Sequence, residues 1–260
     1  MNTPDDRYSR QIRFAPIGEA GQANIHASHA LIVGCGALGS SMANMLVRAG
    51  LGRLTLIDPD KVEWSNLQRQ TLYDEDDARA GRLKVEAAGR RLAAINRDIQ
   101  IEVKAEEVTA ANIESLVGRP DVILDGTDRF PVRYLINDYA VREGLRWIYG
   151  GCAASHGTVL PIEPGRTPCL RCLFPDLPDP NQAATADTVG IIAPVAQIVA
   201  ALQVAEAMKW LSGHAEVPRP VLYQVDLWSG NLQSLALKGS EANCPCCGQG
   251  RYDFLNEAQT

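Results

Sequence analysis

The stretch Ala30 to Gly39, ALIVGCGALG, decides the fold, because an apolar run leads directly into a glycine-rich turn. The run Leu31 to Val33 predicts a short buried strand, and the apolar periodicity of Ser40 to Ala49 predicts a helix after the turn. A second apolar strand is expected at Arg53 to Asp58, RLTLID. This order predicts the strand-helix-strand unit that opens a Rossmann-like sheet and binds an anion at the helix N-terminus.

The three glycines of the turn have separate roles in such a unit. Gly34 allows the tight turn, Gly36 lets the backbone approach a phosphate, and Gly39 allows close packing of the helix. Asp58 follows Gly39 by 19 residues, where a carboxylate can accept hydrogen bonds from ribose hydroxyls. The motif predicts a nucleotide site but leaves NAD, FAD, S-adenosylmethionine and ATP open, because this turn serves all of them.

Composition limits the classes of protein that fit. The 260 residues are 46% hydrophobic and 22% charged, with a net charge of −6, so one large α/β domain is expected and nucleic acid is an unsuitable partner. The polar beginning MNTPDDRYSRQ has no secretory pattern, and polar residues interrupt the most apolar run, Ile191 to Leu211. We therefore expect a cytoplasmic protein with no membrane or nucleic-acid partner.

The remaining elements follow from periodicity and composition. A helix is expected from Arg79 to Asn96, another at Phe130 to Glu143, and a third at Pro194 to Leu211. Strand polarity is expected to become mixed late in the chain, and Asp179 to Ile192 is expected to be a mobile loop. Further strands are expected at Ile99 to Val103, Asp121 to Leu124, Arg146 to Tyr149, Gly157 to Ile162, Val221 to Leu227 and Asn231 to Ala236.

The irregular segment after Asp58, PDKVEWSNLQRQTLY, is rich in polar side chains, among them Asn66, Arg69 and Gln70. Irregular connections of this length are usually functional or disordered, and the apolar residues in this one argue against disorder. Lys84 lies near the start of the next helix, where a cation opposes the helix dipole. It is either a neutral feature of a surface face or is held there by an anion, and we favour the anion.

Asp128 ends the run Asp125-Gly-Thr-Asp128, which directly follows a buried strand. The carboxyl ends of parallel strands are where open α/β folds bind ligands, so this carboxylate is placed to meet phosphates through a metal ion. It could instead cap the helix that begins at Phe130, and the two roles could coexist. For Arg10, on the N-terminal helical arm, a solvated surface position is the simpler interpretation of the residue alone.

Two pairs of cysteines, Cys169-x-x-Cys172 and Cys244-x-x-Cys247, form the most specific pattern in the chain. Four thiolates on two turns suit a closed tetrahedral site for structural zinc, with ligands about 2.3 Å from the metal. Zinc would then tie the C-terminal tail to an earlier loop, with 71 residues between the two pairs. A pair of redox-active dithiols is the alternative, although neither pair opens a helix after a strand. Cys246 is expected to be a bystander.

Taken together, these motifs resemble the ThiF/MoeB/HesA family, the bacterial relatives of ubiquitin-activating E1 enzymes. The resemblance covers about residues 7 to 250 and rests on RYSRQ (7 to 11), GCGALG (34 to 39), Asp58, SNLQRQ (65 to 70), LK (83 to 84), DGTD (125 to 128) and the two cysteine pairs. It implies an α/β fold, a Rossmann-like mixed sheet flanked by helices with a C-terminal zinc knuckle pair. It also implies one adenylation domain over residues 1–260, with a nucleotide-binding half at about 1–150 and a carrier-binding and zinc half at about 151–250.

The activity implied by the resemblance is ATP-dependent adenylylation of the C-terminal glycine of a ubiquitin-like sulfur carrier, with release of pyrophosphate. The carrier would be ThiS-like or MoaD-like and end in Gly-Gly, and a sulfur donor protein would be a further partner. The tail NCPCCGQGRYDFLN and the runs WIYGGC and DTVGII are closer to the ThiF branch, which favours thiamine biosynthesis over molybdenum cofactor synthesis.

The resemblance also implies roles for single residues. Catalysis would involve Arg10, Arg69, Lys84 and Asp128, with Arg10 reaching the site of the neighbouring subunit in a homodimer. Ala37 stands where many relatives have a third glycine, which is a mild departure. The residues implied in nucleotide binding are Gly34, Gly36, Ala37, Gly39, Asp58, Asn66, Arg69, Gln70, Lys84 and Asp128, the last also for magnesium; Cys169, Cys172, Cys244 and Cys247 would bind zinc.

Ala186 is the departure that affects the chemistry. ThiF-like relatives carry a cysteine just before the run that here is Asp187-Thr-Val-Gly190, and alanine cannot form an acyl disulfide with a carrier. Either the protein stops at the adenylate, or the cysteine was replaced by engineering.

Two other classes of function stay open at this point. A nicotinamide or flavin oxidoreductase would account for the glycine turn and Asp58, but it leaves Arg69, Lys84 and the cysteine pairs unexplained. A non-catalytic module that binds ATP or a carrier is the other, and the complete set of charged residues argues against it.

Overall fold

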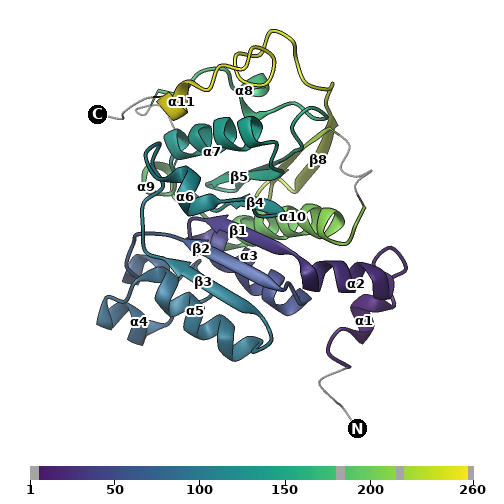
Figure 1. Ribbon diagram of the computed structural model, residues 1–260. Helices are drawn as coiled ribbons and strands as arrows, with labels where there is room; N and C mark the ends of the chain where they lie inside the picture. The colour runs from purple at the N-terminus through teal and green to yellow at the C-terminus, as the bar shows by residue number, and fades with distance from the viewer. Residues whose placement is uncertain (1–5, 180–184, 215–219, 257–260) are drawn as a thin grey trace.

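A single mixed sheet of eight strands runs through the protein, with helices on both faces (Figure 1). The computed structural model describes residues 6–179, 185–214 and 220–256. The strand order is β3-β2-β1-β4-β5-β6-β7-β8, parallel as far as β5 and antiparallel beyond it. The strands are β1 (His29–Val33), β2 (Arg53–Ile57), β3 (Gln100–Lys104), β4 (Val122–Asp125), β5 (Trp147–Ala153), β6 (His156–Ile162), β7 (Val221–Asp226) and β8 (Asn231–Ala236).

The helices divide between the two faces of this sheet. Helices α3, α5 and α10 pack on one face in a core that includes Met42, Leu92 and Val199, and α6 and α7 pack on the other with Tyr134 and Trp147. The helical elements are α1 (Ser9–Ile12), α2 (Gly18–Ala27), α3 (Ala37–Ala49), the short η2 (Trp64–Asn66), α4 (Glu75–Ala80), α5 (Lys84–Ile95), α6 (Ile113–Val117), α7 (Phe130–Glu143), α8 (Leu170–Leu173), α9 (Ala186–Val189), α10 (Ala193–Leu211) and α11 (Asp253–Asn256).

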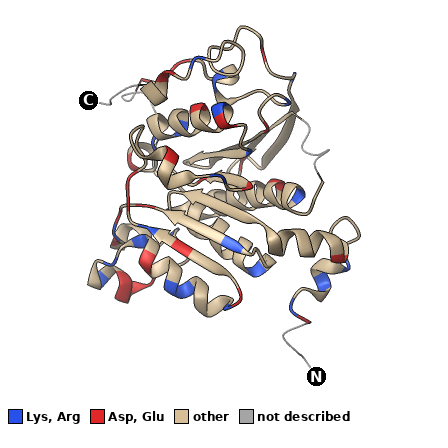
Figure 2. Cartoon of the chain, viewed as in Figure 1, with Lys and Arg blue, Asp and Glu red and all other residues tan. Residues whose placement is uncertain are grey.

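Burial along the strands agrees with this arrangement. All four residues of β4 are buried, as expected for a central strand covered on both faces, whereas all six residues of the edge strand β8 are exposed. Lys and Arg side chains are interspersed with Asp and Glu, most densely on α4 and α5 (Figure 2). Within the described ranges, the helices are all too short or too polar to cross a bilayer.

The predicted sheet, its opening unit and its mixed polarity are confirmed, and two local predictions are wrong. The helix expected from Arg79 to Asn96 is in fact two helices, because Gly81 adopts a left-handed φ of 57° that ends α4, and α5 begins only at Lys84. The loop expected from Asp179 to Ile192 contains the helix α9, which Thr185 caps by accepting a hydrogen bond from the Thr188 N–H at 3.2 Å. The first part of that loop, 180–184, lies outside the described residues.

Candidate active site and metal centre

The carboxyl ends of β1, β2 and β4 meet at one edge of the sheet, and the predicted nucleotide residues follow them. The Gly34 N–H donates to the Ile57 carbonyl at 2.8 Å, and the Gly126 N–H donates to the Val33 carbonyl at 2.7 Å. These bonds bring together the glycine turn after β1, Asp58 after β2 and the Gly126 to Asp128 turn after β4. This is the position at which open α/β sheets bind ligands.

The two turns touch through their backbones. A Cβ on Gly34, whose φ is 87°, would lie 2.6 Å from the carbonyl carbon of Gly126, and one on Gly39 would overlap the Gly34 carbonyl oxygen. A Cβ on Gly36 would have no neighbour closer than the Gln70 Nε2 at 3.8 Å. The protein itself therefore requires glycine at 34 and 39, whereas the open space at Gly36 suits the approach of a ligand.

The start of α3 is open to an anion. Gly36 is its N-cap residue and supplies no side-chain hydrogen bond, so the first N–H groups of the helix lack a side-chain cap. Ala37 is the first helical residue and is partly exposed. Free N–H groups and the positive end of the helix dipole favour a phosphate here.

Asp58 is buried beside this turn. Its Oδ2 accepts a hydrogen bond from the Cys35 N–H at 2.6 Å, and its Oδ1 accepts one from the Asp60 N–H at 2.8 Å. Burial raises the pKa of the Asp58 carboxyl, while the charge of Lys84 and the two backbone bonds oppose that rise. The carboxylate is thus held in one orientation, and each oxygen keeps a lone pair for another donor.

Lys84 is buried at the first position of α5, so the surface alternative is wrong. Its Nζ lies 2.9 Å from the Asp60 Oδ2, which is the anion that the structure provides for it. Burial alone would lower the pKa of Lys84, but the charge of Asp58 and the bond to Asp60 outweigh that effect and raise it. The charge of Asp128 acts in the same direction on the pKa of Lys84. Lys84 is therefore a fixed positive charge at the edge of the sheet.

The segment around η2 contributes three polar side chains to the same region. The Asn66 Oδ1 accepts a hydrogen bond from the Glu63 N–H at 3.1 Å, and the Arg69 Nη1 donates to the Ser65 carbonyl at 2.8 Å. Within the part of the chain that the structure describes, Arg69 has no carboxylate partner. Gln70 is buried with its Oε1 unbonded, and its amide faces Gly36. These side chains keep unused donors and acceptors beside the glycine turn.

Asp128 is exposed and does not cap the next helix. The N-cap of α7 is Arg129, and it makes no side-chain cap bond, so the capping interpretation is wrong. Among the residues that the structure describes, Asp128 has no hydrogen bond or ion pair. An exposed, unpaired carboxylate at this edge is chemically suited to magnesium, which usually takes one or two carboxylates together with substrate phosphates.

Arg10 is not brought to the glycine turn of its own chain. Helix α1 packs at the far end of α3, where the Gln11 Nε2 donates to the Ala49 carbonyl at 2.9 Å. The 13 residues of α3 span roughly 20 Å between that point and the turn. Figure 1 shows α1 and α2 well away from α4, which follows the η2 segment. The exposed Arg10 side chain could therefore serve the site of another chain more readily than its own.

The four predicted metal ligands form one compact group. Their Sγ atoms all lie within 4.8 Å of one another, with Cys169 to Cys244 at 3.6 Å and Cys172 to Cys247 at 3.3 Å. A tetrahedral zinc with bonds of about 2.3 Å would place its thiolates roughly 3.8 Å apart, so the arrangement fits zinc. The Cys246 Sγ lies outside the group and accepts a hydrogen bond from the Asn137 Nδ2 at 3.3 Å.

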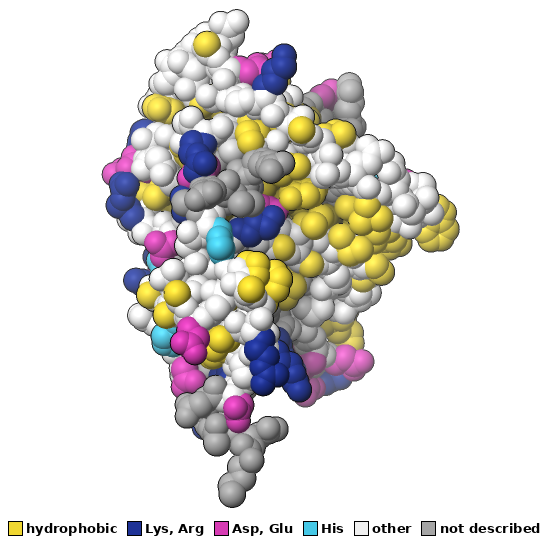
Figure 3. Space-filling view, turned by 90° about the vertical axis from the view of Figure 1, so that its right-hand side faces the viewer, with side chains coloured by type: hydrophobic (Ala, Val, Ile, Leu, Met, Phe, Trp, Pro, Cys, Tyr) yellow, Lys and Arg dark blue, Asp and Glu magenta, His cyan; other side chains and the backbone are white. Residues whose placement is uncertain are grey.

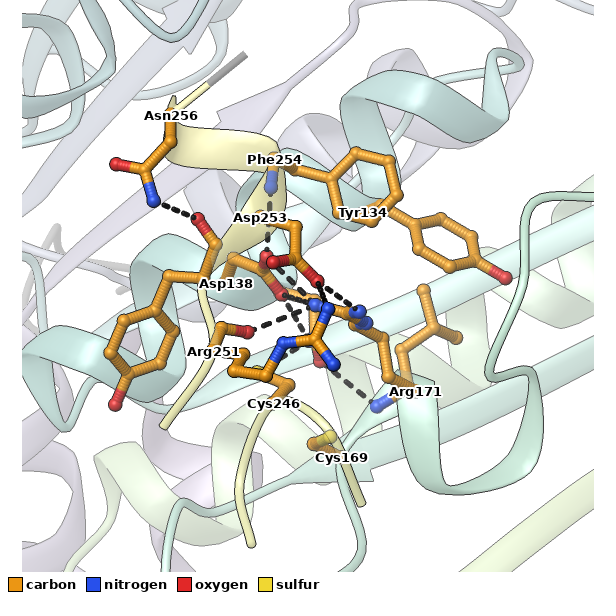
Figure 4. Close-up of polar contacts among 12 residues, drawn as sticks. Tyr134, Asp138, Cys169, Arg171, Cys246, Arg251, Asp253, Phe254 and Asn256 are labelled. Atoms are coloured by element: carbon orange, nitrogen blue, oxygen red, sulfur yellow. Dashed lines mark hydrogen bonds and ion pairs between the residues drawn. The ribbon is translucent and has the colours of Figure 1, made fainter. Parts of the chain in front are cut away.

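A buried polar cluster, shown in Figure 4, ties this centre to α7. The Asp138 Oδ2 accepts hydrogen bonds from the Arg171 Nη1 and the Phe254 N–H, each at 3.2 Å. The Arg171 Nη2 donates to the Asp253 Oδ2 at 2.9 Å. Burial raises the pKa of Asp138, and the charge of Arg171 opposes the rise. Sequence reasoning missed this cluster, because nothing in the spacing of these residues links them.

A second buried pair, Arg133 and Asp125, lies directly behind Asp128. The Arg133 Nε donates to the Asp125 Oδ2 at 3.0 Å, and its Nη2 donates to the Thr127 carbonyl at 2.6 Å. Burial raises the pKa of the Asp125 carboxyl, and Arg133 opposes that rise. Sequence reasoning also missed Arg133. A signal was available, because an arginine in the first turn of a helix opposes the dipole just as Lys84 does.

Comparison with known proteins was consistent with this site. The model of the ThiF family matches residues 8–246. The chain is 46% identical to "Sulfur carrier protein ThiS adenylyltransferase" of Bacillus subtilis (strain 168), covering 98% of this chain and 75% of the relative. It is 33% identical to "SAMP-activating enzyme E1" of Haloferax volcanii, covering 97% and 92%.

A solved structure shares the fold of this chain. The crystal structure of E. coli MccB with ATP superposes with a TM-score of 0.79 at 25% identity, covering 95% of this chain and 75% of MccB. The family model covers nearly the whole described chain, and the Bacillus relative matches almost all of it. The chain therefore belongs to the ThiF family, and its similarity to the Bacillus ThiS adenylyltransferase supports the ThiF branch of the ThiF/MoeB/HesA group.

Proposed function

We propose that this protein is an enzyme that uses ATP to adenylylate the C-terminal glycine of a ubiquitin-like sulfur carrier and releases pyrophosphate. The observation that carries the proposal is the convergence, at one sheet edge, of an uncapped helix N-terminus, a buried acid, two cations and an unpaired carboxylate. The Bacillus ThiS adenylyltransferase and the Haloferax SAMP-activating enzyme, to which the chain is similar, support the same activity.

The residues would divide the work of binding and charge neutralisation. Asp58 would accept hydrogen bonds from the ribose hydroxyls. The phosphates would approach the start of α3 along the small residues of the turn, which are Gly34, Gly36, Ala37 and Gly39. Asn66 and Gln70 would donate from the η2 side. Arg69 and Lys84 would neutralise the triphosphate, whose charge otherwise repels the attacking carboxylate. No general base is required, because a glycine carboxylate is already ionised at neutral pH.

Asp128 is the residue that would hold magnesium. Its exposed oxygens, which have no partner in the described part of the chain, suit a hard cation, and the bound ion would supply further positive charge at the phosphates. Arg10 would add a last positive charge from the second subunit of a homodimer, since it lies far from the turn of its own chain.

The zinc would be structural. Four thiolates close the coordination shell and leave no position for a substrate, and the site joins α8 to the C-terminal tail. The two relatives described above are named as an adenylyltransferase and an activating enzyme, which gives no support to redox dithiols at these positions. Because free thiols persist in reducing surroundings, we place the protein in the cytoplasm.

The protein partner would bind the half that contains 151–250. The hairpin of β7 and β8 exposes Trp228 by 83% and Leu232 by 62%, and isolated monomers rarely expose large apolar areas without function. Hydrophobic side chains also gather over a broad area of the face shown in Figure 3. Both a carrier and a second copy need such a surface. We favour a ThiS-like carrier and thiamine biosynthesis, on the Bacillus relative.

Ala186, the first residue of α9, sets the end point of the reaction that we propose. An alanine cannot form an acyl disulfide, so the protein would stop at the carrier adenylate, and a sulfur donor protein would act afterwards.

ATP–pyrophosphate exchange tests the proposal directly. We expect exchange that depends on a ThiS-like carrier, weaker exchange with a MoaD-like carrier, and a carrier adenylate visible by mass spectrometry. Exchange with neither carrier would contradict the proposal. Tight NADH binding without ATP binding would favour the oxidoreductase, and ATP binding without any adenylate would favour a non-catalytic module.

A further inference from the structure

The buried pair Arg133 and Asp125 sits behind the Gly126 to Asp128 turn and is hydrogen-bonded to the N–H, the hydroxyl and the carbonyl of Thr127. The Asp125 Oδ1 accepts hydrogen bonds from the Thr127 N–H at 2.9 Å and from the Thr127 Oγ1 at 2.7 Å. From the same side, the Arg133 Nη2 donates to the Thr127 carbonyl at 2.6 Å. The peptide groups on both sides of Thr127 are therefore fixed by one ion pair.

That ion pair is itself anchored to the sheet. The Arg133 Nη2 donates to the Gly150 carbonyl at 3.2 Å, and the Gly150 N–H donates to the Asp125 Oδ2 at 3.4 Å. The Gln203 Nε2 donates to the Asp125 carbonyl at 2.9 Å. The guanidinium also stacks at 5.0 Å over the Phe130 ring and at 5.3 Å over the Tyr149 ring. A buried guanidinium with this many contacts has one available geometry.

Asp128 has no such support of its own. It is the next residue after Thr127, it is exposed, and no hydrogen bond from the described residues orients it. Where its carboxylate stands therefore depends on where Arg133 and Asp125 hold the peptide before it.

We propose that Arg133 is a positioning residue for adenylation, which acts through Asp125 and Thr127 to set the place of the Asp128 carboxylate at the nucleotide edge. The inference rests on the proposed function for the role of Asp128. It assigns to Arg133 no contact with ATP or with the carrier.

The test uses the full chain and the variant R133K, which keeps the charge but cannot form the planar fork. We expect exchange to fall about 10²-fold, because a small misplacement of a functional group has effects of that size. We also expect the magnesium concentration for half-maximal ATP binding, measured by calorimetry without carrier, to rise about 10-fold, since residues that orient metal ligands typically change affinity by 10- to 100-fold.

A double-mutant cycle with D128N separates positioning from a general structural role. If Arg133 acts through Asp128, R133K should reduce exchange by less than about 3-fold in the D128N background, because coupled residues are not additive. The matched control is R171K, in an equally buried ion pair with Asp138, which should leave the magnesium dependence unchanged.

Several outcomes would overturn the inference. They are an unchanged magnesium dependence in R133K, a full effect of R133K in the D128N background, or an equal shift in R171K. If R133K does not fold, D125N replaces it, and failure of both to fold would show a purely structural role. A wild-type protein without exchange would refute the proposed function, whereas the magnesium dependence of ATP binding would still decide the role of Arg133.

Discussion

Helix α7 contributes one residue to each of two buried arginine–aspartate pairs, and their surroundings differ. In the first turn of α7, the Arg133 Nε lies 3.0 Å from the Asp125 Oδ2. Further along the same helix, the Asp138 Oδ2 lies 3.2 Å from the Arg171 Nη1. The four side chains are at most 6% exposed. The bonds around Arg133 stay within one turn and the neighbouring strand, whereas those around Asp138 reach α8 and the C-terminal tail.

This contrast teaches that the same ion-pair chemistry can serve two ends. A pair whose remaining side-chain bonds are local fixes the shape of a turn. A pair that collects segments distant in sequence contributes to holding the chain together. We therefore expect damage at the first pair to appear mainly in catalysis and damage at the second mainly in stability.

The largest effect is expected from breaking the proposed zinc site next to the Asp138 pair. C169A should lose the zinc and loosen the C-terminal tail, because structural zinc contributes folding free energy directly, on the order of 10 kcal/mol in small zinc domains. Metal analysis and thermal unfolding would measure both changes. C246A should keep one zinc per chain. Equal metal loss in the two variants would show that the ligand assignment is wrong.

The second-largest effect is expected from breaking the ion pair between Asp138 and Arg171. D138A would leave the Arg171 guanidinium buried with Asp253 as its one ionic partner among the described residues, and removing one member of a buried pair typically costs about 3 kcal/mol or more. Denaturant unfolding would measure the loss, and exchange per folded molecule should stay near the wild-type value. A collapse of exchange with unchanged stability would reverse the division between the two pairs.

On the catalytic side, K84A should cut exchange by about 10²-fold, as the loss of a preorganised electrostatic contact usually does. The same size of effect is expected for R69A. A suitable control is R119A, which removes an exposed arginine that pairs with Glu143 away from the nucleotide edge. Exchange assays at saturating carrier would compare the three variants with the wild type. Equal losses of exchange in K84A and R119A would argue against a specific role for Lys84.

The smallest effect on exchange is expected from A186C. No phosphate contact changes, so exchange should stay within about 2-fold of the wild type, in the range of surface substitutions. With ATP, carrier and a persulfide sulfur donor, this variant alone should form a carrier conjugate that disappears on reduction, because the introduced thiol takes sulfane sulfur from the donor and the resulting persulfide displaces AMP from the carrier adenylate. Gel shifts with and without a reductant would detect it. A reducible conjugate in the unchanged protein would instead implicate another cysteine, such as Cys152 or Cys246.

Much of the fold could be predicted from the sequence, because its signals are local. The run Leu31 to Val33, the glycine turn and the apolar helices each have a periodicity that tertiary packing only completes. The prediction of one continuous helix through Gly81 was wrong for a physical reason. The segment has helical composition on both sides of Gly81, and only the left-handed conformation of this glycine marks the break.

Residues of the candidate site could be predicted where they belong to a sequence motif. They were missed where only the fold brings them together. The four cysteines are brought together as their spacing suggested, and Asp58 and Lys84 lie beside the glycine turn. Asp60 as the partner of Lys84, and Arg133 as the partner of Asp125, depend on strand register and helix packing. No spacing rule could have identified these two pairings, although the position of Arg133 in the first turn of α7 marked that residue itself.

The backbone contact between Gly34 and Gly126 limits how this site could be redesigned. Neither Gly34 nor Gly126 has room for a Cβ, so mutation of these two glycines offers no route to a different nucleotide preference. Variation is open only in the residues that face the turns from outside, above all the segment Asn66 to Gln70. A library built for altered cofactor choice should therefore keep both turns constant and diversify that segment.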